Sequence, residues 1–130
     1  MNEILSKQIE LQDLIYARHG KTNLVVQSPN SIHDTAECIK EHMLHVQIEC
    51  LELIEEIGGG KLSVIKPWSK EYYDFVHAKF ESNDKIKSEA MDVFSFCLNI
   101  LIVSGITPDN IAKEYDKVWQ KNIARQKNGY

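Results

Sequence analysis

The segment Gln47-Ile48-Glu49-Cys50-Leu51-Glu52-Leu53-Ile54-Glu55-Glu56-Ile57 carries a carboxylate every three or four residues, with apolar side chains between them. Residues three and four apart are neighbours on a helix surface, so Glu49, Glu52 and Glu56 predict an acidic stripe on a helix with an apolar back. Far along the chain, Glu89-Ala90-Met91-Asp92 repeats the pattern. If these two helices pack together, their carboxylates form a site for a hard cation.

The composition is that of an ordinary globular protein. The chain has 130 residues, of which 43% are hydrophobic and 26% are charged, and this length suits a single domain over residues 1–130. The net charge of −4 argues against a nucleic-acid-binding surface, which would be basic. Cys38, Cys50 and Cys97 lie in apolar helical patterns, which favours a reducing compartment over a disulfide framework.

Neither a secretory signal nor a membrane span is expected. The N-terminus, Met1-Asn2-Glu3, lacks the basic region of a signal peptide. The longest apolar run, residues 93–105, is interrupted by Ser95, Asn99 and Ser104 and is too short to span a bilayer. This run reads instead as a buried helix.

Five segments have the apolar spacing of helices, and none is convincing as a strand. The predicted helices cover residues 3–18, 32–57, 70–80, 84–104 and 108–123. Ser31 or Asp34 is expected to cap the second helix, Ser69 the third and Thr107 the fifth, while Gly58-Gly59-Gly60 ends the second. The sequence therefore predicts an all-α protein, a bundle of about five helices.

The first and last predicted helices each have an expected inner face. In the first helix the apolar face consists of Ile4, Ile9, Leu11, Leu14 and Ile15, and in the last it consists of Ile111, Ala112, Tyr115 and Trp119. Gln8 and Gln12 are four residues apart and share one face of the first helix. They are either solvated surface positions or a pair of amides lining a pocket.

The carboxylates Glu49, Glu52, Glu89 and Asp92 are the candidate metal ligands. Mg²⁺ prefers oxygen ligands, and two or more such ions bridge a polyphosphate and activate a water molecule for in-line attack. Asp92 and Asn99 lie seven residues apart and share a face of a very apolar helix, where buried polar groups are costly unless satisfied. The alternative is that each acidic pair is a solvated helix face, which is the interpretation for the remaining glutamates of the opening segment.

Other constellations support weaker hypotheses. Cys38, His42 and His45 are residue types that bind zinc, but three side chains along one straight helix do not converge on one ion. A Cys-His hydrolase built on the same residues is no better supported. The three glycines at 58–60 follow a helix, whereas a phosphate-binding loop precedes one. Near the C-terminus, Lys121, Arg125 and Lys127 either bind phosphates or show the usual cation bias at a helix end.

Several motifs resemble those of the all-α NTP pyrophosphatases, the superfamily of the MazG-type enzymes and the dimeric dUTPases. The ExxE and ExxD pairs are its general signature. The C-terminal segment 122–130 is similar to the N-x-x-R-Q-x-x-G-Y motif of the dimeric dUTPases. Residues 89–99 and Gln8-x-x-Leu11-Gln12 resemble the corresponding motifs of the phage dCTP pyrophosphatase/dUTPase group.

This resemblance implies an enzyme that hydrolyses dUTP, dCTP or both to the monophosphate and pyrophosphate. It implies that Glu49, Glu52, Glu89 and Asp92 bind two or more Mg²⁺ ions, and that the protein is a homodimer of two packed protomers acting in the cytoplasm of a bacterial or phage-infected cell. The residues that it implies for substrate binding are Gln8 and Gln12 at the pyrimidine, Asn99 at the deoxyribose, Trp68 and Lys70 near base and phosphates, and Asn122, Arg125, Gln126 and Tyr130 over the phosphates.

The sequence departs from the family pattern in two places. Val118-Trp119 stands where members usually have Lys-Asn, so this pair would not supply the family's usual phosphate contacts, and Ser95 stands where a His is common. Neither change affects the metal carboxylates. A broader MazG-like NTP pyrophosphatase and a non-catalytic nucleotide-binding homologue are the alternative functions.

Overall fold

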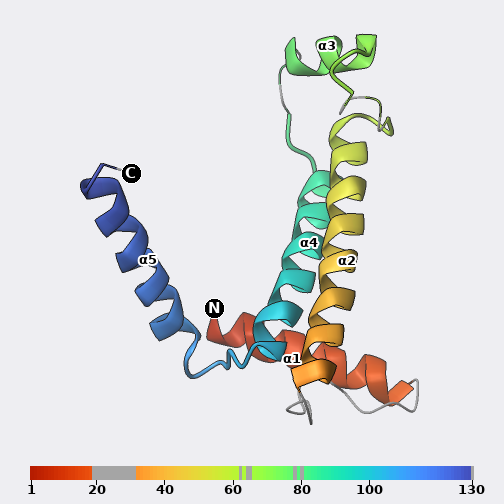
Figure 1. The fold of residues 1–130 in the computed structure, drawn as a ribbon. Helices are drawn as coiled ribbons and strands as arrows, with labels where there is room; N and C mark the ends of the chain where they lie inside the picture. The colour runs from red at the N-terminus through yellow and green to blue at the C-terminus, as the bar shows by residue number, and fades with distance from the viewer. Residues whose placement is uncertain (19–31, 62, 64–65, 78, 80, 130) are drawn as a thin grey trace. The chain divides into compact units, whose positions relative to one another are not determined.

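The computed structural model describes the chain except residues 19–31, 62, 64–65, 78, 80 and 130. The described residues form five helices and no strand, which confirms the all-α prediction (Figure 1). The helices are α1 (Asn2–Arg18), α2 (Ile32–Ile57), α3 (Lys70–His77), α4 (Asp84–Val103) and α5 (Ile111–Lys127). Ser31, one candidate cap of α2, and Tyr130 lie outside the described residues.

The chain divides into two compact units. Unit 1 consists of Met1–Ile39 and Leu98–Tyr130, and unit 2 consists of Lys40–Cys97. The division passes through α2 and α4, so each unit contains part of both helices. The single domain over residues 1–130 stays a prediction.

Glycine ends α2 as the sequence predicts. The Gly60 N–H donates to the Glu55 carbonyl at 2.8 Å and the Gly59 N–H to the Glu56 carbonyl at 3.1 Å, with Gly59 at a φ of 65°. This is the Schellman arrangement, whose left-handed residue favours glycine. The three glycines therefore terminate a helix, and no phosphate-cradling role is needed to explain them.

Side-chain caps are present at the starts of α3 and α4, and the cap of α3 is the predicted Ser69. The Ser69 hydroxyl accepts from the Tyr72 N–H at 3.0 Å at the start of α3. Asn83 Oδ1 accepts from the Ile86 N–H, also at 3.0 Å, at the start of α4. A side-chain oxygen at this position satisfies a backbone donor that the helix itself leaves without a partner.

The limits predicted for α5 were wrong at both ends. Thr107 and Asn110 cap each other reciprocally: the Asn110 N–H donates to Thr107 Oγ1 at 3.3 Å, and the Thr107 N–H donates to Asn110 Oδ1 at 2.8 Å. Asn110 has φ −106° and ψ −14°, so regular helix begins only at Ile111. The helix then continues to Lys127, four residues beyond its predicted end.

The core of unit 1 combines apolar and amide side chains. The buried apolar residues are Leu5, Cys38, Leu98, Ile102, Val103 and Ile111, and the buried polar ones are Gln8, Gln12 and Asn99. The inner face of α1 is therefore formed by Leu5 and the two glutamines. Four of the five apolar residues expected there are 42–64% exposed, and Ile9 is half-buried; the exposed four are Ile4, Leu11, Leu14 and Ile15.

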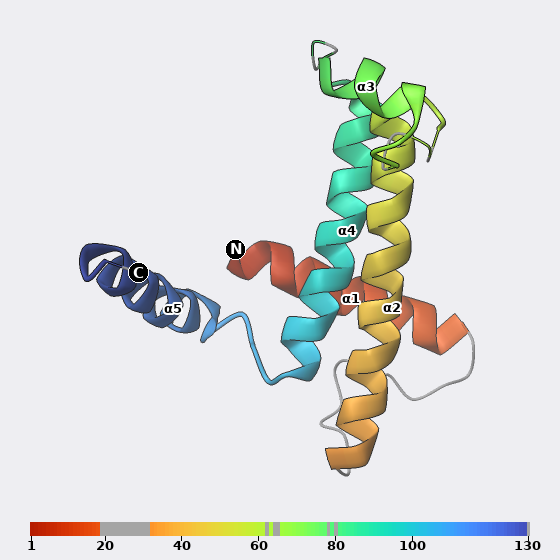
Figure 2. The same ribbon diagram turned by 45° about the horizontal axis from the view of Figure 1, so that its top comes forward.

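In unit 2, α2 and α4 lie side by side and antiparallel in both views (Figures 1 and 2). The side-chain contacts agree with this direction. Glu49 and Glu52, late in α2, lie close to Glu89, early in α4. His45, earlier in α2, stacks on Phe96, later in α4. Antiparallel packing thus aligns the acidic segment of one helix with the acidic segment of the other.

Several apolar side chains expected in a core are exposed. On α5, Tyr115 is 69% and Trp119 is 46% exposed, and Ala112 is also exposed, so only Ile111 of the expected inner face is buried. On α4, Leu101 belongs to the run expected to be buried and is 38% exposed. None of the described helices is both long enough and apolar enough to cross a bilayer.

Candidate functional site

Three of the four predicted metal ligands meet in unit 2. Carboxylate oxygens of Glu49, Glu52 and Glu89 all lie within 4.8 Å of one another. Glu49 and Glu52 come from one face of α2 and Glu89 comes from α4. Among the described residues this is the one group of three or more Asp, Glu, His or Cys side chains with such spacing, and it includes none of Cys38, His42 and His45.

Asp92 lies close enough to the acidic cluster to repel Glu49 electrostatically, although it is not part of the 4.8 Å group. The pKa of Glu49 is raised above its ordinary value by partial burial and by the negative charges of Glu52, Asp92 and Glu89, and it is lowered by His45. Asp92 is exposed, which corrects the expectation that it is buried within an apolar helix. Four acidic side chains are thus held close enough to repel one another.

The donor set fits a hard divalent cation. All of its oxygens are carboxylate oxygens, which Mg²⁺ prefers, and no thiolate or imidazole is within the group. Mutual repulsion destabilises the ionised cluster, and a bound cation relieves it. The cluster is half-buried to exposed, so water and a substrate have access to an ion held there.

Unit 1 holds a second polar constellation, formed by buried amides. Gln8 Nε2 donates to Asn99 Oδ1 at 2.8 Å, and Asn99 is only 1% exposed. Gln12 lies one turn after Gln8 on α1 and is also buried. The solvated-surface alternative for the two glutamines is therefore wrong. The bond uses the Gln8 amide as donor and the Asn99 carbonyl as acceptor.

The remaining predicted substrate-binding residues lie on exposed surfaces. Trp68 is 81% exposed, and Lys70 forms an ion pair with Asp74 on its own helix at 2.6 Å. No hydrogen bond or ion pair joins either residue to the acidic cluster within the described part of unit 2.

The predicted phosphate-binding residues of the C-terminal motif that the structure describes are also exposed. Asn122, Arg125 and Gln126 lie on the last turns of α5, so this part of the motif is helical rather than a polar tail. Tyr130 lies outside the described residues.

From the sequence alone, His42 and His45 were considered only as zinc ligands or as part of a Cys-His hydrolase, and the row to which they belong was missed. His42, His45, Glu49 and Glu52 follow one another at spacings of three, four and three residues, which places them on one face of α2. Both imidazoles contact the ring of Phe96, with centroid distances of 6.5 Å from His42 and 5.0 Å from His45. The spacing was visible in the sequence, but the shared partner on α4 was not.

His42 is buried without a partner for either ring nitrogen among the described residues. It is 6% exposed, and neither Nδ1 nor Nε2 forms a hydrogen bond. Its pKa is lowered by burial and by His45, while Glu41 acts in the opposite direction. Burial therefore favours the neutral form of this imidazole in the folded protein.

We expect this burial to make stability depend on pH. Because the pKa of His42 is lower in the folded than in the unfolded chain, unfolding takes up a proton below about pH 6.5, so the free energy of unfolding falls as the pH decreases through that range. Urea unfolding at pH 7.5 and about pH 5.5 measures the fall. In His42→Phe the contribution of this residue should disappear. An equal fall in that variant would assign the effect to other groups.

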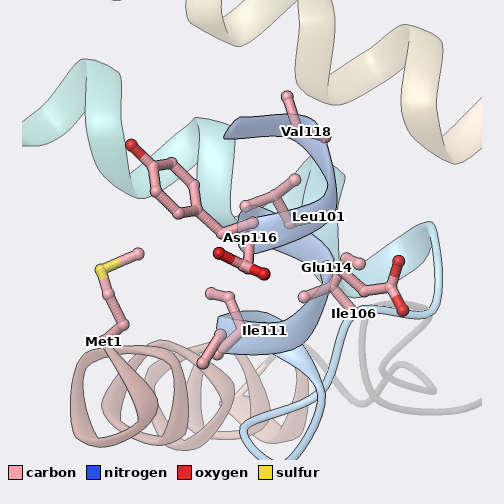
Figure 3. Close-up of a pocket in the computed structure, with 9 residues that line it drawn as sticks. Met1, Leu101, Ile106, Ile111, Glu114, Asp116 and Val118 are labelled. Atoms are coloured by element: carbon pink, nitrogen blue, oxygen red, sulfur yellow. The ribbon is translucent and has the colours of Figure 1, made fainter. Parts of the chain in front are cut away.

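A cavity of about 720 Å³ in unit 1 contains none of the predicted site residues. Its wall is mainly apolar, with Leu101, Ile106, Ile111 and Val118 around it and the carboxylates of Glu114 and Asp116 nearby (Figure 3). None of the described residues that line it has an amide or basic side chain of the kind that recognises a nucleotide. Val118, at one of the two positions that depart from the family motif, contributes to this apolar wall.

Comparisons with known proteins extend the resemblance over nearly the whole chain. A dCTP pyrophosphatase of Enterobacteria phage LZ5 is 28% identical over 138 residues, which cover 98% of this chain and 80% of that protein. A dCTP pyrophosphatase of Enterobacteria phage T4 is 25% identical over 140 residues, which cover 97% of this chain and 82% of that protein. No protein-family profile matches, and no solved structure matches. The similarity to phage dCTP pyrophosphatases supports the resemblance seen in the motifs.

Proposed function

We propose that this chain is a Mg²⁺-dependent pyrophosphohydrolase that converts dCTP, dUTP or both to the monophosphate and pyrophosphate. The observation that carries the proposal is the group of three carboxylates from two antiparallel helices, with oxygens within 4.8 Å of one another. The two phage relatives are named dCTP pyrophosphatases and match almost the full chain. The acidic cluster supports a cation-dependent reaction, and the names of the relatives support a pyrimidine deoxynucleoside triphosphate as the substrate.

In this proposal the acidic cluster holds the cations. Glu49, Glu52, Glu89 and Asp92 are the ligands, and two or more Mg²⁺ ions, when bound, neutralise phosphate charge and activate water for attack. A carboxylate of the cluster that is not occupied by a cation can accept a proton from the attacking water.

The amide cluster is proposed to recognise the nucleoside. Gln8 and Gln12 would face the pyrimidine and Asn99 the deoxyribose, since buried amides offer fixed donors and acceptors to a ligand. An amide pairs with either a cytosine or a uracil edge, so this set accommodates both bases. Trp68 and Lys70 would contribute near base and phosphates, and Asn122, Arg125, Gln126 and Tyr130 would close over the phosphates.

A nucleotide panel tests the reaction. The purified chain is incubated with dCTP, dUTP, dTTP and purine nucleoside triphosphates, with Mg²⁺ or with a chelator, and released pyrophosphate is measured. We expect Mg²⁺-dependent release from dCTP, dUTP or both, and none in chelator. Comparable rates on purine nucleotides would favour a broader NTP pyrophosphatase. Nucleotide binding by calorimetry without turnover would favour a non-catalytic homologue.

We also propose that the working form is a homodimer. Leu44, Ile48 and Leu51 share one face of α2 and are 57%, 42% and 45% exposed. Monomeric proteins rarely leave a contiguous apolar face of this kind in contact with water. A second copy of the chain, which carries the same face, is the simplest cover for it.

Disruption of this apolar face should separate the dimer. Ile48→Glu adds a charge in the centre of the face, and burial of an unpaired charge is strongly unfavourable. Light scattering coupled to size exclusion should give twice the chain mass for the wild type and the chain mass for the variant. Gln47→Glu adds the same charge at the adjacent exposed position and should leave the dimer intact. A dimeric Ile48→Glu with native helicity would contradict this interface.

A further inference from the structure

His45 lies one helical turn before Glu49 on the same face of α2. Side chains at this spacing are neighbours, with Cβ atoms about 5–6 Å apart. The imidazole is half-buried, and no hydrogen bond to it is present among the described residues. It therefore brings a hydrogen-bonding group to the edge of the acidic cluster that nothing else in the described structure uses.

The orientation of this imidazole is restricted by the facing helix. The His45 ring stacks on Phe96 of α4 with centroids 5.0 Å apart and an angle of 19° between the planes. Stacking holds the plane of the ring, so its nitrogens point along that plane rather than toward the Phe96 face. A side chain held in this way is suited to position a neighbour, because little freedom is lost when it forms a hydrogen bond.

The chemistry of the two side chains suits this arrangement. An N–H donated to a carboxylate favours its ionised form, which is the form that binds a cation. His45 is the residue with an N–H donor one turn before Glu49 on this face of α2. Carboxylates that bind metals are usually held by such outer partners, and loss of the partner weakens metal affinity.

We propose that His45 is a positioning residue of the cation site: when a cation is bound, the imidazole donates a hydrogen bond to the Glu49 carboxylate and holds it in the orientation that binds the cation. This inference rests on the proposed function, because it presupposes that Glu49 binds a cation. His45 and Glu49 would form a histidine–carboxylate pair one turn apart on α2, with the histidine ring held by stacking on Phe96. The alternative is that His45 only fills space against Phe96.

Two substitutions separate these roles. His45→Phe keeps an aromatic ring against Phe96 and removes the donor, whereas His45→Gln removes the ring and keeps an N–H donor. Binding of Mn²⁺ to the full chain is measured by calorimetry at one pH, without nucleotide. We expect His45→Phe to weaken Mn²⁺ binding by about 10- to 100-fold and His45→Gln to stay close to the wild type.

The reverse order, with His45→Phe close to the wild type, would overturn the inference in favour of packing, and so would equal losses in both variants. His42→Phe is the matched control: the same substitution, in contact with the same ring, but two turns from Glu49, with unchanged Mn²⁺ affinity expected. Glu49→Gln is titrated in parallel. If it loses Mn²⁺ binding while His45→Phe keeps it, only the inference fails. If Glu49→Gln binds as the wild type does, the proposed cation site itself fails.

Discussion

Glu49→Gln is expected to reduce pyrophosphate release by on the order of 10²- to 10³-fold or more, since it removes a charged ligand from the place where phosphate charge must be neutralised. The folded structure should survive. Glu49 is surrounded by Glu52, Asp92 and Glu89, so neutralising it relieves repulsion rather than breaking a favourable pair. The melting temperature followed by circular dichroism should therefore equal or exceed that of the wild type.

Glu55→Gln is the matched control for this substitution. Glu55 is exposed on the same helix, and the substitution makes the same change of charge outside the 4.8 Å group. We expect its rate of pyrophosphate release to equal that of the wild type. Full activity in Glu49→Gln, or a comparable loss in both variants, would contradict the assignment of the acidic cluster as the metal site.

The second large effect is expected at the buried amide pair. Asn99→Leu leaves the Gln8 amide without its partner in the core of unit 1, and an unsatisfied buried polar group costs about 1–3 kcal/mol of stability. The double variant Gln8→Leu/Asn99→Leu removes both partners. Replacing both with apolar groups of similar shape is close to neutral, so the double variant should be more stable than Asn99→Leu.

Activity then distinguishes a structural amide pair from a nucleotide-binding one. If Gln8 and Asn99 contact the substrate, the double variant stays impaired even when its stability has recovered, with kcat/KM lower by roughly tenfold for each hydrogen bond lost. Urea unfolding gives the stability and steady-state pyrophosphate release gives kcat/KM. A double variant with recovered stability and wild-type kcat/KM would show that the pair only holds the core together.

Parts of α1 and α2 have polar side chains on the inner face and apolar side chains on the outer face, and this arrangement links the site to the proposed dimer. Toward their partners, α1 presents Gln8 and Gln12, and α2 presents a row of His and Glu side chains. Toward water, α2 presents Leu44, Ile48 and Leu51. An apolar outer face is explained when a second copy covers it, and a polar inner face when a ligand occupies it.

The helices and their ends could be predicted because they depend on neighbours in the sequence. Ser69 caps α3, Asn83 caps α4 and the glycines at 58–60 end α2, each through hydrogen bonds that span no more than five residues. The start of α5 was wrong by three residues because Thr107 pairs with Asn110, a reciprocal cap that postpones regular helix. Residue preferences near helix starts predicted Thr107 as a capping residue, but not that regular helix begins only at Ile111.

The sequence alone determined the all-α class, the terminators and the acidic face that contains Glu49 and Glu52, since each follows from helical spacing and local capping. Only the tertiary structure decided which faces are inside. It buried Gln8 against Asn99, 91 residues away, and left Leu11 and Leu14 exposed. It also brought Glu89 to the acidic face and stacked Phe96 on His45. The physical reason is that the burial of a face depends on the side chains packed against it, and helical periodicity shows which residues share a face but not what that face meets.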